Sequence, residues 1–208
     1  MSEKVLPVPY ITQPTSITCQ STCLKMFGLF LANRMPFPPP VRAMTVQDIW
    51  KEINESEDRP SSTRNSYQNM VWWLGKYFPG HDFEVSSTKN TGEATGKVVH
   101  YINQNYPIMV STNHARTSGH IILVIGYRNH FLDQSSSVQF ICHDPYGKFD
   151  PQLGSLKYGM RRYDGGMSLL DGGEIGPGKS VVYDYQGIQR IRSDKHSTGT
   201  YYMISAGR

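Results

Sequence analysis

Residues 11–30 read ITQPTSITCQSTCLKMFGLF, and two cysteines stand where the apolar part of this stretch begins. Apolar side chains then recur at helical spacing, which predicts a helix over 19–32. The residues on its apolar face are Cys19, Cys23, Met26, Phe27, Phe30 and Leu31. Two interpretations of the cysteines are open at this point. Both pack in the core, or one of them is a thiol nucleophile at the start of a helix.

The length and composition of the chain indicate a globular protein. A chain of 208 residues is long enough to bury a core as one domain over 1–208. Hydrophobic residues make up 38% and charged residues 18%, which argues against a disordered chain. The formal net charge of +4 is compatible with anionic partners such as cell-wall polymers. The basic residues are scattered and do not interleave with aromatic ones, so we expect no nucleic-acid partner.

The first residues, MSEKVLPVPYITQ, do not have the pattern of a signal peptide. No apolar run in the sequence is long enough to cross a membrane. We therefore expect a chain that is cytoplasmic as synthesised and does not insert into a membrane. Release from the cell would then need a route other than general secretion.

The cysteines of the chain are at positions 19, 23 and 142. Their odd number and the lack of a secretory signal argue against a disulfide framework. No two of them have the CxxC spacing of a zinc site, so we expect no metal ligation. Core thiols or one reactive thiol remain as interpretations.

Helices are predicted mainly in the first half of the chain. Thr45 and Asp48 form a capping pattern before VQDIWKEI at 46–53, whose apolar residues form a stripe. A third helix is predicted over 65–78 and a fourth over 96–105.

Strands are predicted mainly in the second half. YPIMVSTN at 106–113 is rich in β-forming residues, and GHIILVIGYRN at 119–129 is the strongest strand pattern in the chain. SVQFICHDP at 137–145 is the expected hairpin partner of that strand. Glycine-rich turns follow, and TYYMISAG at 200–207 is a terminal strand. The order of elements predicts a single α+β domain.

Cys19 is the better candidate nucleophile in the opening stretch. Ser16 or Thr18 supplies a hydroxyl that can cap the helix, which places Cys19 in the first turn. Backbone N–H groups without partners cluster there and favour the negative charge of a thiolate. Cys23 lies one turn deeper, where we expect a buried packing residue.

Three further residues supply the groups that a cysteine nucleophile needs. Gln13 has a side-chain amide that can donate to an oxyanion, together with the backbone N–H of Cys19. His120 follows Gly119 and begins the apolar strand, where an imidazole can act as general base. Asp144 ends the next strand and can orient that imidazole. Each also has a structural interpretation as a loop, core or turn residue, and the ordered set is what favours catalysis.

The set resembles the bacteriocin-processing cysteine peptidases and their stand-alone peptidase C39-like relatives. The resemblance lies in Gln13, in CQSTCLKM from Cys19 onward, in GHIILVIGY at 119–127 and in DPYG at 144–147. It implies a papain-like cysteine peptidase fold of the α+β class, with N-terminal helices packed on a mainly antiparallel sheet.

The same resemblance implies a role for each residue of the set. Cys19 would be the nucleophile, His120 the base, Asp144 the orienting acid and Gln13 the oxyanion donor, with no metal and no cofactor. One departure is Gln20-Ser21, where the family often has Gly-Pro.

Two other histidines lie close to the set in the sequence. His114 is a spare histidine near the site, either without a role or in contact with substrate. His143 precedes Asp144 and is expected on the opposite face of its strand, so we do not include it in the site.

The expected reaction is hydrolysis of an amide bond in a peptide or in peptidoglycan. The absence of a signal pattern and the mild positive charge favour a phage-type lysin that cuts peptidoglycan cross-links after release through a holin. A cysteine protease that processes a protein or a leader peptide is the first alternative. A binding module that retains the fold without turnover is the second, and the complete Gln/Cys/His/Asp set favours an enzyme over it.

Overall fold

The computed structural model describes residues 3–15, 17–112, 120–128, 138–149, 163–164, 178–184 and 201–207. Its helices are α1 (Cys19–Ala32), the 3-10 helix η1 (Pro40–Arg42), α2 (Val46–Glu55), α3 (Tyr67–Tyr77) and α4 (Thr91–Asn103). Its first strands are β1 (Glu3–Val5), β2 (Asp82–Thr88), β3 (Ile108–Thr112), β4 (His120–Arg128) and β5 (Gln139–His143). The later strands are β6 (Lys148–Phe149), β7 (Tyr163–Asp164), β8 (Val181–Asp184) and β9 (Tyr201–Gly207).

A seven-stranded sheet is the centre of the fold. Its strand order is β2-β9-β3-β4-β5-β8, and β1 pairs with β4 beyond the end of β3. The strand pairs in the described residues are all antiparallel. The mainly antiparallel sheet expected from the sequence is therefore present. The last described strand along the chain, β9, lies between β2 and β3.

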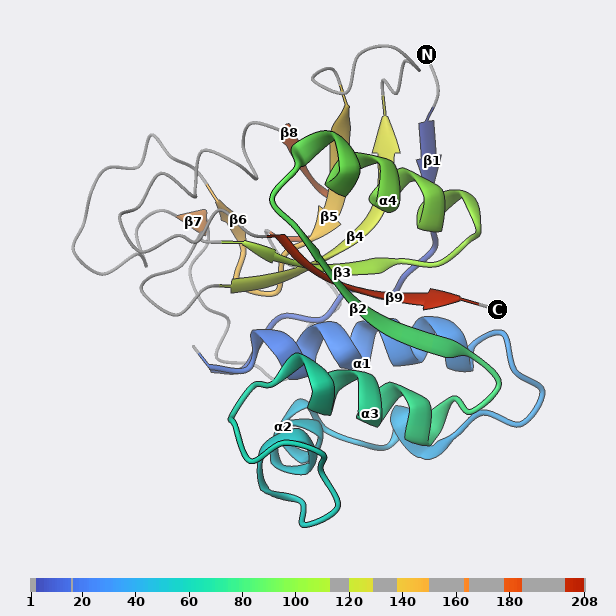
Figure 1. Ribbon diagram of the computed structural model, residues 1–208, viewed down its shortest axis with the longest axis vertical. Helices are drawn as coiled ribbons and strands as arrows, with labels where there is room; N and C mark the ends of the chain where they lie inside the picture. Colours follow the sequence, from blue (N-terminus) through green and yellow to red (C-terminus); the bar gives the residue numbers. More distant parts are fainter. Residues whose placement is uncertain are drawn as a thin grey trace.

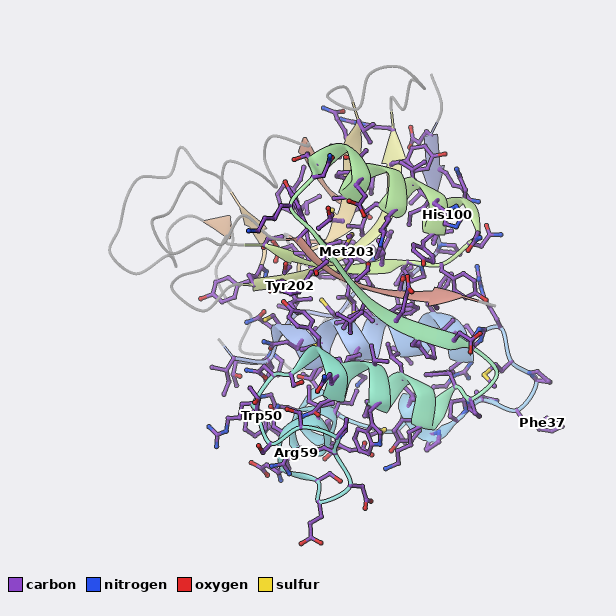
Figure 2. All side chains as sticks on the ribbon, viewed as in Figure 1. Phe37, Trp50, Arg59, His100, Tyr202 and Met203 are labelled. Carbon is purple, nitrogen blue, oxygen red and sulfur yellow. The ribbon has the colours of Figure 1, made fainter. Side chains whose placement is uncertain are left out.

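Helices cover both faces of this sheet (Figure 1). Helix α1 packs on β4, while α2 and α3 pack against α1 on the same side. Helix α4 lies across the other side of the sheet. Figure 2 shows this separation through two labelled side chains, His100 on α4 and Trp50 on α2, which lie on opposite sides. None of the helices in the described ranges has the length and apolar character that crossing a membrane requires.

The predicted second helix begins with the expected cap. Thr45 accepts a hydrogen bond from the Asp48 backbone at 3.0 Å, and the Asp48 carboxylate accepts from the Thr45 backbone at 2.8 Å. This capping box satisfies two amide groups that a helix start leaves without partners. The prediction is confirmed, and the buried Ile49 and Ile53 form the expected apolar stripe.

One strand was missed by the sequence analysis, and the predicted start of one helix was wrong. No strand was expected at 82–88, where β2 pairs with β9 along its whole length. Helix α4 begins at Thr91 and not at 96, because Asn90 caps it by accepting a hydrogen bond from the Glu93 backbone at 3.1 Å. Gly92 weakens the helical pattern of this first turn and conceals it in the sequence.

The segment before α1 runs alongside the sheet, and most of its residues from Leu6 to Gln13 are buried. The Leu6 backbone donates to Ile125 O at 2.8 Å, and the Gln13 backbone donates to Pro145 O at 2.9 Å. Gly126 permits the close approach of β1, because a Cβ at this position would collide with the backbone of Lys4. This segment brings Gln13 to the turn that follows β5.

Candidate active site

Cys19 is the first residue of α1, as the sequence predicted, and only 5% of its surface is exposed. Thr18 is the N-cap residue, but its hydroxyl makes no capping bond and instead donates to Thr15 O at 3.0 Å. The expectation that Thr18 caps the helix through its side chain was therefore wrong. Ser16, the other candidate, lies outside the described residues. The first-turn amides of a helix lack backbone partners and favour a negative charge near the helix N-terminus, where Cys19 stands.

His120 and Asp144 form a direct, buried pair. The His120 Nε2 and Asp144 Oδ1 atoms are 2.7 Å apart, and the two side chains are 2% and 0% exposed. Strand β4 begins at His120, and Asp144 follows the last residue of the adjacent β5. The antiparallel pairing of these strands, with Leu123 opposite His143, brings the two residues together. Gly119, expected to leave room beside His120, lies outside the described residues.

The Asp144 carboxylate accepts further hydrogen bonds within the protein. Its Oδ1 atom accepts from the Tyr146 backbone at 3.0 Å, and its Oδ2 atom accepts from the Tyr183 hydroxyl at 2.8 Å. The Asp144 backbone carbonyl accepts from the Gly147 N–H, which closes the DPYG turn, and from the Tyr10 hydroxyl. The buried carboxylate is thus held in a fixed orientation, which is what an orienting acid requires.

The surroundings of His120 favour its protonated form. Burial alone would lower its pKa, but the charge and the hydrogen bond of Asp144, followed by a hydrogen bond with Cys19, raise the pKa to about 10. Since Asp144 occupies Nε2, the ring nitrogen that remains for Cys19 is Nδ1. The Tyr146 ring meets the imidazole edge-on, with centroids 6.0 Å apart. An imidazolium between a thiol and a carboxylate can both stabilise a thiolate and donate a proton.

Gln13 is fully buried and lies next to the DPYG turn, through its backbone bond to Pro145. Its Nε2 atom donates to Thr15 O at 2.6 Å. An amide nitrogen has two hydrogens, so one N–H remains for a further acceptor. The role of Gln13 as oxyanion donor stays a prediction.

The other two cysteines are packing residues with little tendency to ionise. Cys23 is fully buried and its Sγ atom lies 3.4 Å from Ile121 O. Burial raises the pKa of the Cys23 thiol well above its usual value, and burial does the same to Cys142. The Cys19 Sγ atom lies 3.3 Å from the Gln20 side-chain oxygen. Gln20 is the residue at which the sequence departs from the family pattern.

His143 has a structural role away from this site. Its Nε2 atom bonds Val8 O at 2.9 Å, and its Nδ1 atom accepts from the Ser180 N–H at 3.1 Å. Burial lowers the pKa of His143, so the ring is neutral and links the N-terminal segment to the residues before β8. Its exclusion from the site agrees with these contacts. His114 lies outside the described residues.

Two residues that contact Asp144 directly lie far from it in the sequence and were not predicted. Tyr183 is on β8, and Gly178 precedes this strand at a point where a Cβ would collide with the Asp144 backbone. Neither belongs to a recognisable motif, and only the tertiary structure brings them to Asp144. Within the described ranges no cluster of three or more His, Cys, Asp or Glu side chains is arranged to hold a metal ion. The expectation that the reaction needs no metal stays a prediction.

Comparisons with known proteins identify a family and a similar fold. The model of the peptidase C39-like family matches residues 5–160. The crystal structure of UfSP from C. elegans is similar in fold, with a TM-score of 0.54 and 13% sequence identity. That match covers 100% of this chain and 34% of the other, so the chain spans about a third of the length of UfSP. No curated protein matches the chain.

The family match includes the opening stretch, the helices at 46–55 and 67–77 and both strands of the His120–Asp144 pair. It thereby extends the resemblance across 33–95, which the motifs alone did not cover. The fold and the family expected from the sequence are both confirmed. The chain belongs to the peptidase C39-like family and has a papain-like fold.

Proposed function

We propose that the chain is a cysteine peptidase that works through Cys19, His120 and Asp144, with Gln13 as oxyanion donor. The observation that supports the proposal most strongly is the buried 2.7 Å contact of His120 with Asp144, together with the hydrogen bond of Cys19 to the same imidazole. We also propose that residues 1–208 form one peptidase domain, since residues from Leu6 to Ala206 belong to one buried core cluster.

The proposed reaction has two stages. The Cys19 thiolate attacks the carbonyl carbon of the amide, and the oxygen that becomes negative accepts from Gln13 Nε2 and from the Cys19 backbone N–H. His120 then gives its proton to the departing amine nitrogen, the C–N bond breaks and a thioester remains. In the second stage His120 takes a proton from water, the hydroxide attacks the thioester carbonyl, and the acid product leaves with the thiolate restored.

We propose peptidoglycan peptide cross-links as the substrate and a phage-type lysin as the biological role. The formal net charge of +4 supports this, because a basic protein is attracted to an acidic cell wall. We propose a holin-type route as the way in which this lysin reaches the wall. The experiment is incubation of the purified protein with purified sacculi, followed by mass spectrometry of the released fragments. New amino termini at cross-link positions are the expected result.

The matched control for that assay is Cys19→Ala protein on the same sacculi, which should release nothing. A denatured protein mixture treated in parallel tests the other substrate class. Cleavage of proteins with intact sacculi would assign the enzyme to protein or leader-peptide processing and overturn the lysin proposal, while the triad would stand. Catalytic silence on every substrate, with Cys19 unreactive, would favour a binding module.

A thiol reagent should inactivate the enzyme, whereas a chelator should have no effect on its activity. We expect EDTA to leave the release of fragments unchanged, because attack by a thiolate needs no metal ion. Iodoacetamide should abolish release by alkylating Cys19. The measurement is the rate of fragment release after each treatment and removal of the reagent. Loss of activity in EDTA that added divalent cation restores would contradict the metal-free mechanism.

A further inference from the structure

Strand β8 brings a buried tyrosine to the carboxylate of the site. The Tyr183 hydroxyl donates to Asp144 Oδ2 at 2.8 Å, while the other carboxylate oxygen, Oδ1, faces His120. Tyr183 is 5% exposed and Asp144 is 0% exposed, so water does not compete strongly for this hydrogen bond. Both the strand and the tyrosine lie outside residues 5–160, the part of the chain that the family model matches.

The position of Tyr183 is fixed by two kinds of backbone contact between β8 and the Asp144 segment. Strand β8 pairs with β5, with Val181 opposite Cys142 and Tyr183 opposite Phe140. Just before β8, Gly178 O accepts from the Asp144 N–H at 2.9 Å. Gly178 has no Cβ, and a side chain at this position would collide with the Asp144 carbonyl and the Tyr10 hydroxyl. The absence of that side chain lets the two backbones lie in contact, which aligns the tyrosine with the carboxylate.

We propose that Tyr183 is a positioning residue that acts on His120 through Asp144. Its O–H holds the carboxylate in the plane in which Oδ1 meets His120 Nε2. It also draws part of the negative charge toward Oδ2, so that it moderates the attraction of Asp144 for the imidazolium. The proposal rests on the catalytic roles given above for Cys19, His120 and Asp144.

Tyr183→Phe tests both parts of this role. The substitution keeps the buried ring and removes only the hydroxyl. More negative charge then faces His120, so the pH at which the imidazolium loses its proton should rise by roughly half a unit or more. The looser carboxylate should lower kcat/KM by about tenfold. Asp144→Asn should move the same transition in the opposite direction, because it removes the charge altogether.

The transition can be measured without knowledge of the substrate. The rate of Cys19 alkylation by iodoacetamide, followed by mass spectrometry from acid pH to beyond the His120 pKa of about 10, reports both partners of the thiolate–imidazolium pair. The upper transition of this profile reports deprotonation of His120. The kcat/KM value comes from fragment release by the same variants.

Tyr127→Phe is a closely matched control. Tyr127 is 6% exposed, lies on β4 of the same sheet, and donates its hydroxyl to Asn103 Oδ1 at 2.8 Å. The control therefore loses a hydrogen bond of the same length from a tyrosine of similar exposure, but this bond is part-buried and its acceptor is Asn103 and not Asp144. We expect wild-type kcat/KM and a wild-type upper transition, with a comparable loss of thermal stability in both tyrosine variants.

The outcomes separate this proposal from the catalytic roles on which it depends. An unchanged or lowered upper transition in Tyr183→Phe, with Asp144→Asn still shifting it downward, would overturn the role of Tyr183 and leave the triad standing. An unchanged transition in Asp144→Asn itself would contradict the triad. Equal shifts in Tyr183→Phe and Tyr127→Phe would assign the effect to general loosening of the sheet and would also overturn the proposal.

Discussion

Cys19→Ala is expected to remove turnover almost entirely, while Cys23→Ala leaves turnover and lowers the melting temperature. Loss of the reacting atom typically costs several orders of magnitude in kcat. Cys23 lies one turn further along α1, is fully buried and contacts the Ile121 carbonyl, so its truncation leaves a small void at a cost of about 1 kcal/mol. Initial rates and thermal unfolding of both variants give the comparison.

Selective alkylation is the independent check of the same assignment. Burial raises the pKa of both Cys23 and Cys142, which keeps them as unreactive thiols at neutral pH. Limited iodoacetamide treatment should therefore modify Cys19 first, as peptide mapping would show. Modification of Cys23 or Cys142 ahead of Cys19 would mean that the nucleophile is wrongly assigned.

The dependence of activity on pH should be bell-shaped, and its alkaline side should depend on Asp144. His120 must be protonated to give a proton to the leaving amine, so activity is present below its raised pKa of about 10 and is lost as the pH rises through that value. In Asp144→Asn the charge that favours the imidazolium is gone. The alkaline limb should move to lower pH and kcat should fall.

His120→Ala should be far more damaging than Asp144→Asn at every pH, because it removes the proton donor itself. Full pH profiles of kcat/KM for the wild type and the two variants make this comparison. His114→Ala is the control, since that histidine is close in sequence and has no role in the proposed mechanism. A loss with His114→Ala equal to that with His120→Ala, or an alkaline limb that stays in place in Asp144→Asn, would refute the arrangement.

The groups of the candidate site were predictable because each stands in a local pattern with a physical meaning. The sequence shows a cysteine in the first turn of a helix, a histidine at the start of an apolar strand and an aspartate at the end of the next strand, and the resemblance of this ordered set to a known family implied their roles. The pairing of β4 with β5 then brings His120 and Asp144 together. Tyr183 has no such pattern. It reaches Asp144 only because β8 is added beside β5, and sequence periodicity does not encode the choice of neighbouring strands.

Elements of the fold with a strong local sequence signal were also predictable. The long apolar run of β4 and the capping box of α2 are strong local signals, and both elements are present. Strand β2 was missed because it lies at the edge of the sheet and six of its seven residues are exposed or half-buried. An edge strand has one partner and little buried area, and in β2 only Phe83 and Val85 alternate with polar residues, which is a weak signal for a strand.

The place of β9 in the sheet has a consequence for how the protein is made. Tyr201–Gly207 is the last described strand to be synthesised, yet it pairs with β2 on one side and β3 on the other. In a nascent chain that does not yet include these residues, the strand that pairs with both β2 and β3 is missing, so each of the two has an unpaired edge. Assembly of the sheet therefore waits for contacts between residues more than a hundred positions apart, such as Val85 with Ile204, a topology of the slow-folding kind. Until that strand emerges from the ribosome, the growing peptidase has unpaired strand edges that can aggregate with other chains.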